Sequence, residues 1–189
     1  MPNELQFDPD THTYTINGRR LISVTQALAI ADDRRMVDPY YLERGRILHK
    51  ACEYLDRDEL DLETLDDQIR PYFLAYVKFQ EDTGFKPDLI ELRLSHLTYL
   101  YAGTIDRIGD LNGNHVLIDL KSGAPAKADP LQLAAYWELA RVNTIPIKRL
   151  FDLYLHDDST YRLVEVVKPK LLLPVFLSAL TLTRWRNGL

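Results

Sequence analysis

The chain has 189 residues, of which 46% are hydrophobic and 27% charged, and its formal net charge is −5. This composition is typical of a globular domain with a sizeable core, and it argues against a protein that holds nucleic acid mainly through a large basic surface. No apolar run approaches the roughly 20 residues of a membrane span, and the first residues lack the basic and then apolar order of a signal peptide. We therefore expect a cytoplasmic protein without a membrane partner.

The first part of the chain predicts a hairpin followed by helices. Asn17-Gly18 lies between two short alternating runs, a strong hairpin signal because both turn residues need a positive φ. Ser23 or Thr25 is placed to cap a short helix, and Asp38 is placed to cap a longer one. The expected elements are strands at 13–16 and 19–22, a short helix after them, and helices from about 39 to 55 and from 66 or 67 to 83.

After Pro87 the hydrophobic period changes from helical to alternating. We expect three consecutive strands, a helix capped by Asp129, a further hairpin and a final helix. These elements are strands at 89–96, 101–110 and 115–121, a helix at 131–142, strands at 149–156 and 161–167, and a helix from 169 onward. Because no repeat or linker interrupts the pattern, we expect residues 1–189 to form one α/β (α+β) domain with a central sheet flanked by helices.

The hairpin formed by the second and third of these strands carries two aspartates and a lysine. With Asn112-Gly113 as the two-residue turn, Asp106 lies opposite Asp119, with Cβ atoms about 5 Å apart. Like charges at that distance destabilise a sheet, and a divalent cation would reverse the penalty. Lys121 lies on the same face as Asp119 because side chains alternate with a period of two residues.

Two carboxylates and a lysine suit metal-assisted cleavage of a phosphodiester, since Mg²⁺ prefers hard oxygen ligands. Asp106, Asp119 and the backbone carbonyl of Leu120 are candidate ligands, and Lys121 could position the attacking water or stabilise charge on the phosphate. A lone Asp-x-Lys on a strand is more often a solvated face. The apolar residues around this one favour strands buried on both faces, where an ionised group needs a partner or a metal.

Four segments resemble, in the same order, the motifs of the RecB-like exonuclease branch of the PD-(D/E)xK nuclease superfamily. They are Gly45–Lys50, Gly103–Ile108, Ile118–Gly123 and Leu131–Tyr136. The resemblance implies a restriction-endonuclease-like mixed sheet, with residues 39–189 as the nuclease core and residues 1–38, a hairpin and a short helix, as an N-terminal extension. It also implies Mg²⁺ or Mn²⁺ as the cofactor.

The resemblance assigns roles to individual side chains. The implied catalytic residues are Asp106, Asp119, Lys121, Gln132 and Tyr136. His49 would be a metal ligand, completing a mixed nitrogen and oxygen site that tolerates Mn²⁺ as well as Mg²⁺; taken alone, it is more often a structural histidine. Glu53, one turn along the same helix, and Glu91, on the first strand of the meander, are further candidate ligands. A solvated Glu53 stays open as an alternative, as does a Glu91 that pairs with an arginine or lies bare on the strand face.

Several basic and aromatic residues are candidate nucleic-acid contacts. Arg44, Arg46, Lys50 and Arg107 could contact phosphates, although each such residue is more often surface charge. Trp185, between two arginines, is a candidate contact as well, with a packed ring as the favoured alternative. The 11 tyrosines are compatible with stacking on unpaired bases.

Cys52 is the only cysteine, so the chain cannot supply the four cysteines that hold an iron–sulfur cluster in one subgroup of these nucleases. The resemblance therefore points to a small, cluster-free nuclease of the phage type, whose leader the segment 14–25 also resembles.

The leading hypothesis is a Mg²⁺- or Mn²⁺-dependent DNA exonuclease acting in replication, recombination or repair. A non-catalytic DNA-binding or recombination scaffold is one alternative, and hydrolysis of RNA or another phosphoester is a second. The expected partner is DNA, with a single-strand-binding or recombination protein as a further candidate. The motifs leave exonuclease against endonuclease, polarity, strand preference and oligomeric state open.

Overall fold

The computed structural model describes residues 4–31 and 38–188. Its elements run along the chain as follows: β1 (Leu5–Asp8), β2 (Thr13–Ile16), β3 (Arg19–Ser23), α1 (Val24–Leu28), α2 (Pro39–Asp56), the 3₁₀ helix η1 (Leu62–Thr64), α3 (Arg70–Thr83), β4 (Lys86–His96), β5 (Tyr101–Leu111), β6 (Asn114–Lys121), α4 (Asp129–Val142), β7 (Arg149–Leu155), β8 (Tyr161–Glu165) and α5 (Pro169–Arg186). None of the helices described is long and apolar enough to cross a bilayer.

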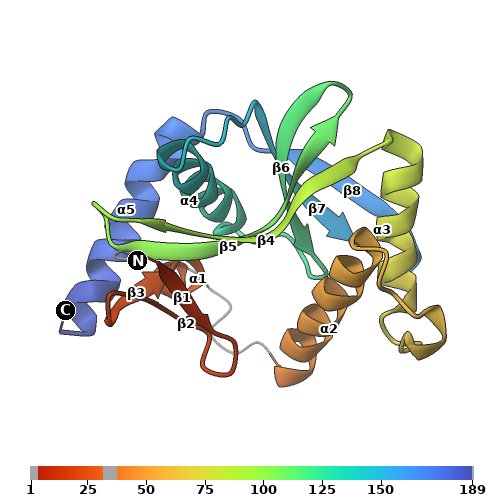
Figure 1. Ribbon diagram of the computed structural model, residues 1–189, viewed down its shortest axis with the longest axis horizontal. Helices are drawn as coiled ribbons and strands as arrows, with labels where there is room; N and C mark the ends of the chain where they lie inside the picture. Colours follow the sequence, from red (N-terminus) through yellow and green to blue (C-terminus); the bar gives the residue numbers. More distant parts are fainter. Residues whose placement is uncertain (1–3, 32–37, 189) are drawn as a thin grey trace.

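A mixed sheet of eight strands lies between two groups of helices (Figure 1). The strand order is β1-β2-β3-β5-β6-β7-β8, with β4 on the other edge of β5. The β3–β5 and β6–β7 pairs are parallel and the others antiparallel. One core lies under α1, α4 and α5, and a second lies under α2 and α3. The structure thus confirms the expected fold class, a mixed central sheet flanked by helices.

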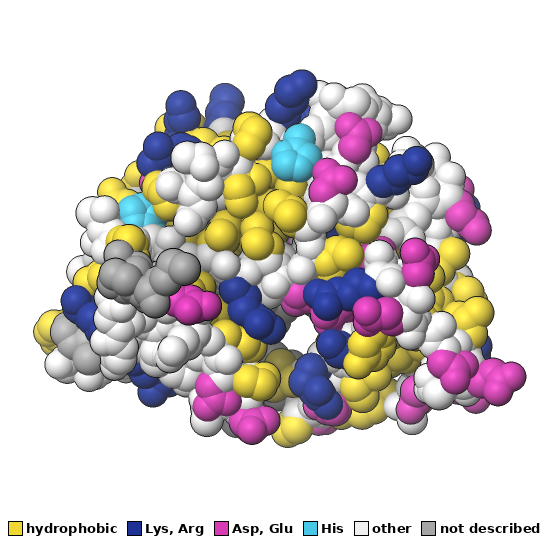
Figure 2. All heavy atoms as spheres, viewed as in Figure 1, with side chains coloured by type: hydrophobic (Ala, Val, Ile, Leu, Met, Phe, Trp, Pro, Cys, Tyr) yellow, Lys and Arg dark blue, Asp and Glu magenta, His cyan; other side chains and the backbone are white. Residues whose placement is uncertain are grey.

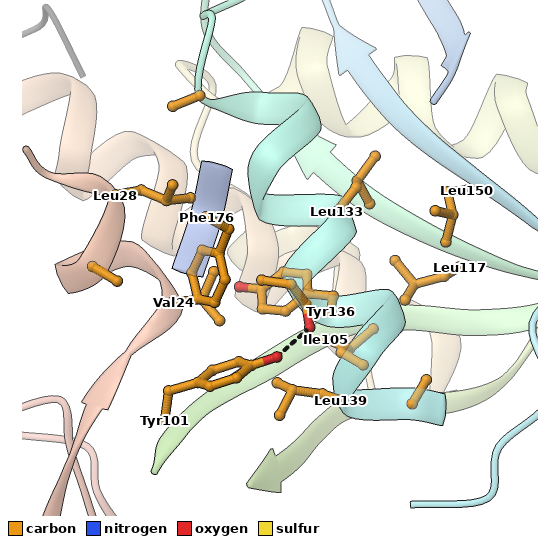
Figure 3. Close-up of a cluster of buried hydrophobic side chains, with 14 of the residues drawn as sticks. Val24, Leu28, Tyr101, Ile105, Leu117, Leu133, Tyr136, Leu139, Leu150 and Phe176 are labelled. Atoms are coloured by element: carbon orange, nitrogen blue, oxygen red, sulfur yellow. Dashed lines mark hydrogen bonds between the residues drawn. The ribbon is translucent and has the colours of Figure 1, made fainter. Parts of the chain in front are cut away.

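The first core fixes α4 against the sheet and against α5 (Figure 3). Tyr101 of β5 is fully buried there, and its hydroxyl donates to the carbonyl of Ala135 in α4 at 3.0 Å. The ring of Tyr136 lies in the same layer. Helix α4 is therefore held rigidly over the central strands, which fixes the positions of the side chains that it presents to them.

The N-terminal hairpin is confirmed, with Asn17 and Gly18 at φ +50° and +75° in its turn. Ser23 forms a capping box with Gln26 at the start of α1, and the carboxylate of Asp38 caps α2. The sequence pattern missed β1, which pairs with β2 at the edge of the sheet, because no Asn-Gly or Asp-Gly turn marks residues 9–12 between the two strands.

Two helix starts differ from expectation. Helix α3 begins at Arg70, directly before Pro71, because proline fits best in the first turn. The interpretation of Asp129 as a helix cap is wrong: it lies inside the first turn of α4 and makes no capping bond there. Its carboxylate instead accepts from the backbone N–H of Ala126 at 2.7 Å and from the hydroxyl of Tyr154 at 2.9 Å.

The central hairpin has the predicted turn and register. Asn112 and Gly113 have φ values of +54° and +74°, and Arg107 pairs with Ile118. One position further, the regular ladder stops, and the carboxylate of Asp106 accepts the N–H of Leu120 at 2.7 Å. A side chain thus replaces the ladder where β5 and β6 part.

The parting of these strands creates the floor of a cleft. Along its whole length, one edge of β5 pairs with β4, so β3 and β6 must share the other edge. Strand β3 pairs with residues 101–102 and β6 with residues 107–111, which leaves residues 103–106 between the two ladders. Gly103 is required here because a Cβ at this position would lie 2.7 Å from the ring of Tyr136.

Candidate active site

The residues singled out by their sequence motifs meet in one cleft of about 720 Å³. Its lining includes His49 from α2, Glu91 from β4, Asp106 from β5, Asp119 and Lys121 from β6, and Gln132 and Tyr136 from α4. Figure 2 shows a hollow below the centre of the face, between the strands β1 and β2 and the helix α2, with acidic and basic side chains along its edge. Five separate elements therefore contribute to a single site.

A tight group of candidate metal ligands lies on the α2 side of the cleft. One ligand atom each from His49, Glu91 and Asp106 lies within 4.8 Å of the others. The ring of His49 bridges its neighbours: Nε2 is 3.0 Å from the carbonyl oxygen of Leu120, and Nδ1 is 3.5 Å from Oδ1 of Asp106. The structure thus brings together four of the predicted ligands, the Leu120 carbonyl included.

This group fits a divalent cation. Carboxylate and carbonyl oxygens with one imidazole nitrogen suit Mg²⁺ or Mn²⁺. His49 Nε2 and the Leu120 oxygen are joined by a hydrogen bond of 3.0 Å, which an ion bound to both atoms would replace. The donor set therefore fits one divalent ion once the imidazole has lost its proton.

A hydrogen-bonded chain lies on the α4 side of the cleft. Asp119 and Lys121 face α4 because the alternate residues Ile118 and Leu120 pack under α2 and α3. Lys121 Nζ contacts Oδ2 of Asp119 and donates to the Gln132 side-chain oxygen at 2.8 Å.

The amide of Gln132 completes this chain. Its nitrogen is 3.1 Å from Oδ1 of Asp119 and 3.1 Å from the hydroxyl of Tyr136. Asp119 is thus held by Lys121 and Gln132 and is not in the closest ligand group, although it lines the same cleft. The regular pairing ends at Arg107 and Ile118, so the predicted cross-strand pair of Asp106 and Asp119 does not form. The two carboxylates line the same cleft and are bonded in different directions.

Two acids of the cleft, Glu91 and Asp119, have raised pKa values, whereas the pKa of Asp106 is lowered. Burial, with the charge of Asp106, raises the pKa of Glu91 to about 7. Burial also raises the pKa of Asp119 to about 6 against the opposing effect of Lys121. For Asp106, burial acts in the same direction but the charge and hydrogen bond of His49 outweigh it, so its pKa is lowered.

For His49, burial and the neighbouring acids affect the pKa in opposite directions. Burial alone would lower the pKa of its imidazole, but Asp106, Glu91 and Asp119 outweigh that effect and raise the pKa to about 9. In the metal-free protein the imidazolium therefore supplies the positive charge of the ligand group. A bound cation would take over this role and would favour the ionised form of each carboxylate.

Backbone strain marks the position of Glu91. It has φ +52° in the middle of β4, a left-handed conformation that residues with a Cβ rarely adopt and that costs about 1–3 kcal/mol. Its carboxylate accepts from Arg107 Nη1 at 3.0 Å and also lies within ligand distance of His49 and Asp106. The strained residue is thus held between a buried cation and the ligand group, and the structure does not show the bare strand-face glutamate.

Glu53 lines the cleft, but its carboxylate forms ion pairs with two basic residues, one in its own helix and one at its end. It is 9% exposed, and its two oxygens are each 2.9 Å from a cation, Lys50 on one side and Arg57 on the other. It is neither solvated nor part of the closest ligand group. Among the candidate phosphate contacts, Lys50 and Arg46 line the cleft, the latter paired with Glu43.

The two other candidate phosphate contacts require correction. Arg107 is fully buried and binds Asp56, Glu91 and the carbonyl of Asp106, so it cannot reach a substrate phosphate. It instead fixes Glu91 from beneath. Arg44 donates to the carbonyl of Ser122 at 2.7 Å and does not line the cleft, so it anchors the segment after β6.

Sequence reasoning missed one acid behind the site. Asp152 of β7 is 1% exposed and lies beside Asp119 in the parallel ladder. Burial and the charge of Asp119 raise its pKa to about 8, and its Oδ1 has no hydrogen-bond partner among the described residues. The available signal was a single acid inside the apolar run Leu150–Leu153.

Sequence reasoning also gave no role in the cleft to the N-terminal strands. Phe7, His12 and Tyr14 line it and form a cluster of rings with centroids 4.7–5.7 Å apart. The Tyr14 hydroxyl is 2.6 Å from Oγ1 of Thr104 on the cleft floor. The N-terminal strands thus form an aromatic wall opposite α2.

Solved structures provide relatives in fold. A candidate exonuclease from Eubacterium rectale has 12% identity and a TM-score of 0.60, with 89% of this chain and 82% of that chain covered. LHK-Exo, an alkaline exonuclease from Laribacter hongkongensis, has 10% identity and a TM-score of 0.50, with 88% and 87% covered. Its complex with dAMP gives 12% identity, a TM-score of 0.51 and the same coverage. At such identities these likenesses show the fold alone.

Family comparison is more specific. No curated protein matches the chain. The family model described as the PD-(D/E)XK nuclease superfamily matches residues 46–169, which is more than half of the chain and includes the ligand group, Lys121 and Gln132. The chain therefore belongs to the PD-(D/E)XK nuclease superfamily.

Proposed function

We propose that this protein is a Mg²⁺- or Mn²⁺-dependent deoxyribonuclease, specifically an exonuclease of the RecB-like branch and of the cluster-free phage type. The observation that carries the proposal is the juxtaposition, in one cleft, of the His49, Glu91 and Asp106 ligand group with the Asp119 and Lys121 pair. The names of the similar solved structures, exonucleases in both cases and one with dAMP bound, support DNA as the substrate.

In the proposed mechanism, His49, Asp106, Asp119, the Leu120 carbonyl and Glu91 would hold the cation. Such an ion supplies positive charge for the phosphoryl oxygens and makes water more acidic. The chain's own residues then position the reactants around it, and the geometry of the lysine indicates how.

Lys121 acts as a cation and hydrogen-bond donor in this proposal. Burial lowers the pKa of its amine, but Asp119 and Asp129 outweigh that effect and raise it, so Lys121 is protonated in the metal-free protein. Its ammonium would hold the attacking water or a phosphate oxygen. Gln132 orients this ammonium and Asp119 together, and Tyr136 in turn orients Gln132.

We also propose that residues 1–189 act as one unit, with 1–38 as an extension that completes the substrate cleft. Strand β3 pairs directly with β5, α1 belongs to the core under α4, and the first strands form the aromatic wall. Those rings would stack on the bases of an unpaired end.

The test is the degradation of linear DNA labelled at one end, with Mg²⁺, Mn²⁺ or EDTA, by the wild-type protein and by the Asp119→Asn and Lys121→Ala variants. The expected result is metal-dependent release of short products by the wild type only. Lys127→Ala is the matched control because Lys127 is exposed and lies outside the cleft. Equal activity in all four proteins would overturn the proposal.

Two further substrates sharpen the assignment. A covalently closed circle should stay intact under conditions that degrade the linear form, because an exonuclease needs an end; cutting of the circle would indicate an endonuclease. A matched RNA strand should be cleaved more slowly than the DNA, and the reverse order would assign the protein to RNA. Binding without cleavage in every metal would indicate a non-catalytic scaffold. A pull-down from infected cells would test for a recombination or single-strand-binding partner.

A further inference from the structure

A second cavity, of about 770 Å³, lies at the other end of the N-terminal strands and shares no lining residue with the cleft. Four arginines line it: Arg19 and Arg20 at the start of β3, and Arg184 and Arg186 in the last turn of α5. We call it the arginine pocket. Figure 1 shows the C-terminal end of α5 beside β3, away from α2 and α3. Among the residues that the structure describes, none of those that line this pocket carries a carboxylate.

Within residues 4–31 and 38–188, no acid pairs with the arginines of this pocket. Arg184 donates to the backbone carbonyls of Tyr99 and Leu100, the latter at 2.8 Å, and not to an acid. Arg19, Arg20 and Arg186 are exposed, and none of them pairs with a carboxylate in the part of the chain that the structure describes. Burial and the charge of Arg19 lower the pKa of Arg184.

This concentration of positive charge is unusual in a chain with a net charge of −5. The dipole of α5 would attract Arg184 and Arg186 to its C-terminal end, but it gives no reason for two more arginines on β3. Clustered guanidinium groups without acids are well suited to bind phosphate, to which each can donate two hydrogen bonds. The ligand class indicated is therefore a phosphate-bearing anion.

Two features favour a nucleic-acid strand over a free phosphate. Trp185, between the two arginines in sequence and outside the pocket lining, is 79% exposed, so it is not the packed ring that the sequence favoured. An exposed indole next to phosphate-binding groups is suited to stack on an unpaired base. The turn between β3 and α1 also forms a wall of both cavities: residues 23–25 line the cleft, and residues 21, 22 and 26 line the arginine pocket.

We propose that the arginine pocket binds the phosphodiester backbone of a single-stranded DNA segment outside the catalytic cleft, with Trp185 stacked on one of its bases. This inference rests on the proposed function, since it extends the substrate path of the same nuclease. The pocket would hold the substrate while the bond to be cut lies in the cleft on the other side of the β3–α1 turn.

The test is fluorescence anisotropy with a labelled single-stranded 20-mer in EDTA, so that cleavage does not contribute, over a range of salt concentrations. We compare the wild type with the double variant Arg19→Gln/Arg20→Gln and with Trp185→Ala. In the wild type, log K should fall linearly with the logarithm of the salt concentration. The slope of this line should become less negative by about 0.7 for each phosphate contact that the double variant loses. Trp185→Ala should weaken binding about fivefold or more.

The matched control is Arg162→Gln/Lys170→Gln, which removes the same charge from exposed positions outside both cavities and should bind like the wild type. Unchanged affinity and salt dependence in both pocket variants would overturn the proposal. The arginine pocket would then be assigned to binding an acidic protein surface. Displacement of the strand by inorganic phosphate at equal phosphate concentration and matched ionic strength would also overturn it. Failure of the proposed function would appear separately, as absence of metal-dependent cleavage by the wild type.

Discussion

The two sides of the catalytic cleft satisfy their polar groups in different ways. The lysine side, Asp119, Lys121, Gln132 and Tyr136, is joined by hydrogen bonds and one ion pair. The metal side, His49, Glu91 and Asp106, crowds its ligand atoms within 4.8 Å and depends on a protonated imidazole for positive charge.

This difference indicates how the site is assembled. The chain alone preorganises the lysine side, which therefore needs no cofactor to hold its geometry. The metal side leaves Glu91 with a pKa raised to about 7 and strain in its backbone. A cation would relieve the repulsion there, so the two sides should respond differently to metal and to mutation.

The largest expected effect is loss of catalysis without loss of metal binding. Lys121→Met removes the donor on the lysine side and should lower the single-turnover cleavage rate by about 10²–10³-fold. The stabilisation of the variant by Mn²⁺ should match that of the wild type, because Lys121 is not in the ligand group. Lys127→Met is the control, and a loss of rate below about tenfold would contradict the role given to Lys121.

The second largest effect tests whether the metal side binds the cation. At 100 times its dissociation constant, a bound cation should stabilise the wild type by about 2.7 kcal/mol. Asp106→Asn should abolish most of this gain, whereas the exposed Asp110→Asn, on the same strand, should keep it. Thermal unfolding at increasing Mn²⁺ provides the measurement, and an equal gain in the two variants would place the ion elsewhere.

A third change tests how the lysine side is supported. Gly103→Ala would place a methyl group 2.7 Å from the Tyr136 ring and should cost about 1–3 kcal/mol of unfolding free energy. Gly123→Ala, where nothing lies within 4 Å of the new methyl group, is the matched control. Urea unfolding of both variants measures the difference, and equal stabilities would show that Tyr136 is not fixed by this contact.

The smallest effect concerns pH. Folding raises the pKa of Glu91 from 4.5 to about 7 and that of Asp152 from 3.8 to about 8, so the folded state binds protons more tightly than the unfolded state. The stability that these protons contribute is present below about pH 4 and is lost as pH rises toward 8. His49 adds a loss of the same sign between pH 6.5 and about 9.

Metal-free Asp152→Asn should therefore lose less stability than the wild type between pH 5 and 8. The gain from Mn²⁺ should increase with pH, since the ion competes with the proton on His49. Chemical unfolding at each pH, with and without Mn²⁺, tests both statements; parallel curves for the two proteins would contradict the assignment of Asp152.

Local patterns predicted what depends on local physics. Asn112-Gly113 set the turn and thereby the register that brings Asp106 and Asp119 to one place, because positive φ at two successive positions leaves few alternatives. The mixed sheet and the placement of His49 beside the candidate metal ligands were implied by the resemblance to the nuclease family. The catalytic roles given to the residues of the cleft stay predictions.

What the sequence did not reveal depends on contacts between distant segments. Arg107 looks like a surface cation until Asp56 and Glu91 are seen to enclose it. Asp152 becomes part of the site only because β7 pairs with β6 in parallel, a partnership that no short-range pattern encodes. The left-handed φ of Glu91 is likewise a consequence of the surrounding structure.

The most direct test of the central claim is a crystal structure of the protein with Mn²⁺, with the ion located by its anomalous scattering. The account predicts a peak bonded to His49, Asp106, Asp119, Glu91 and the Leu120 carbonyl at about 2.1–2.3 Å, with the hydrogen bonds from Lys121 to Gln132 and from Gln132 to Tyr136 unchanged. A peak at another place, or no peak in the cleft at saturating Mn²⁺, would contradict it.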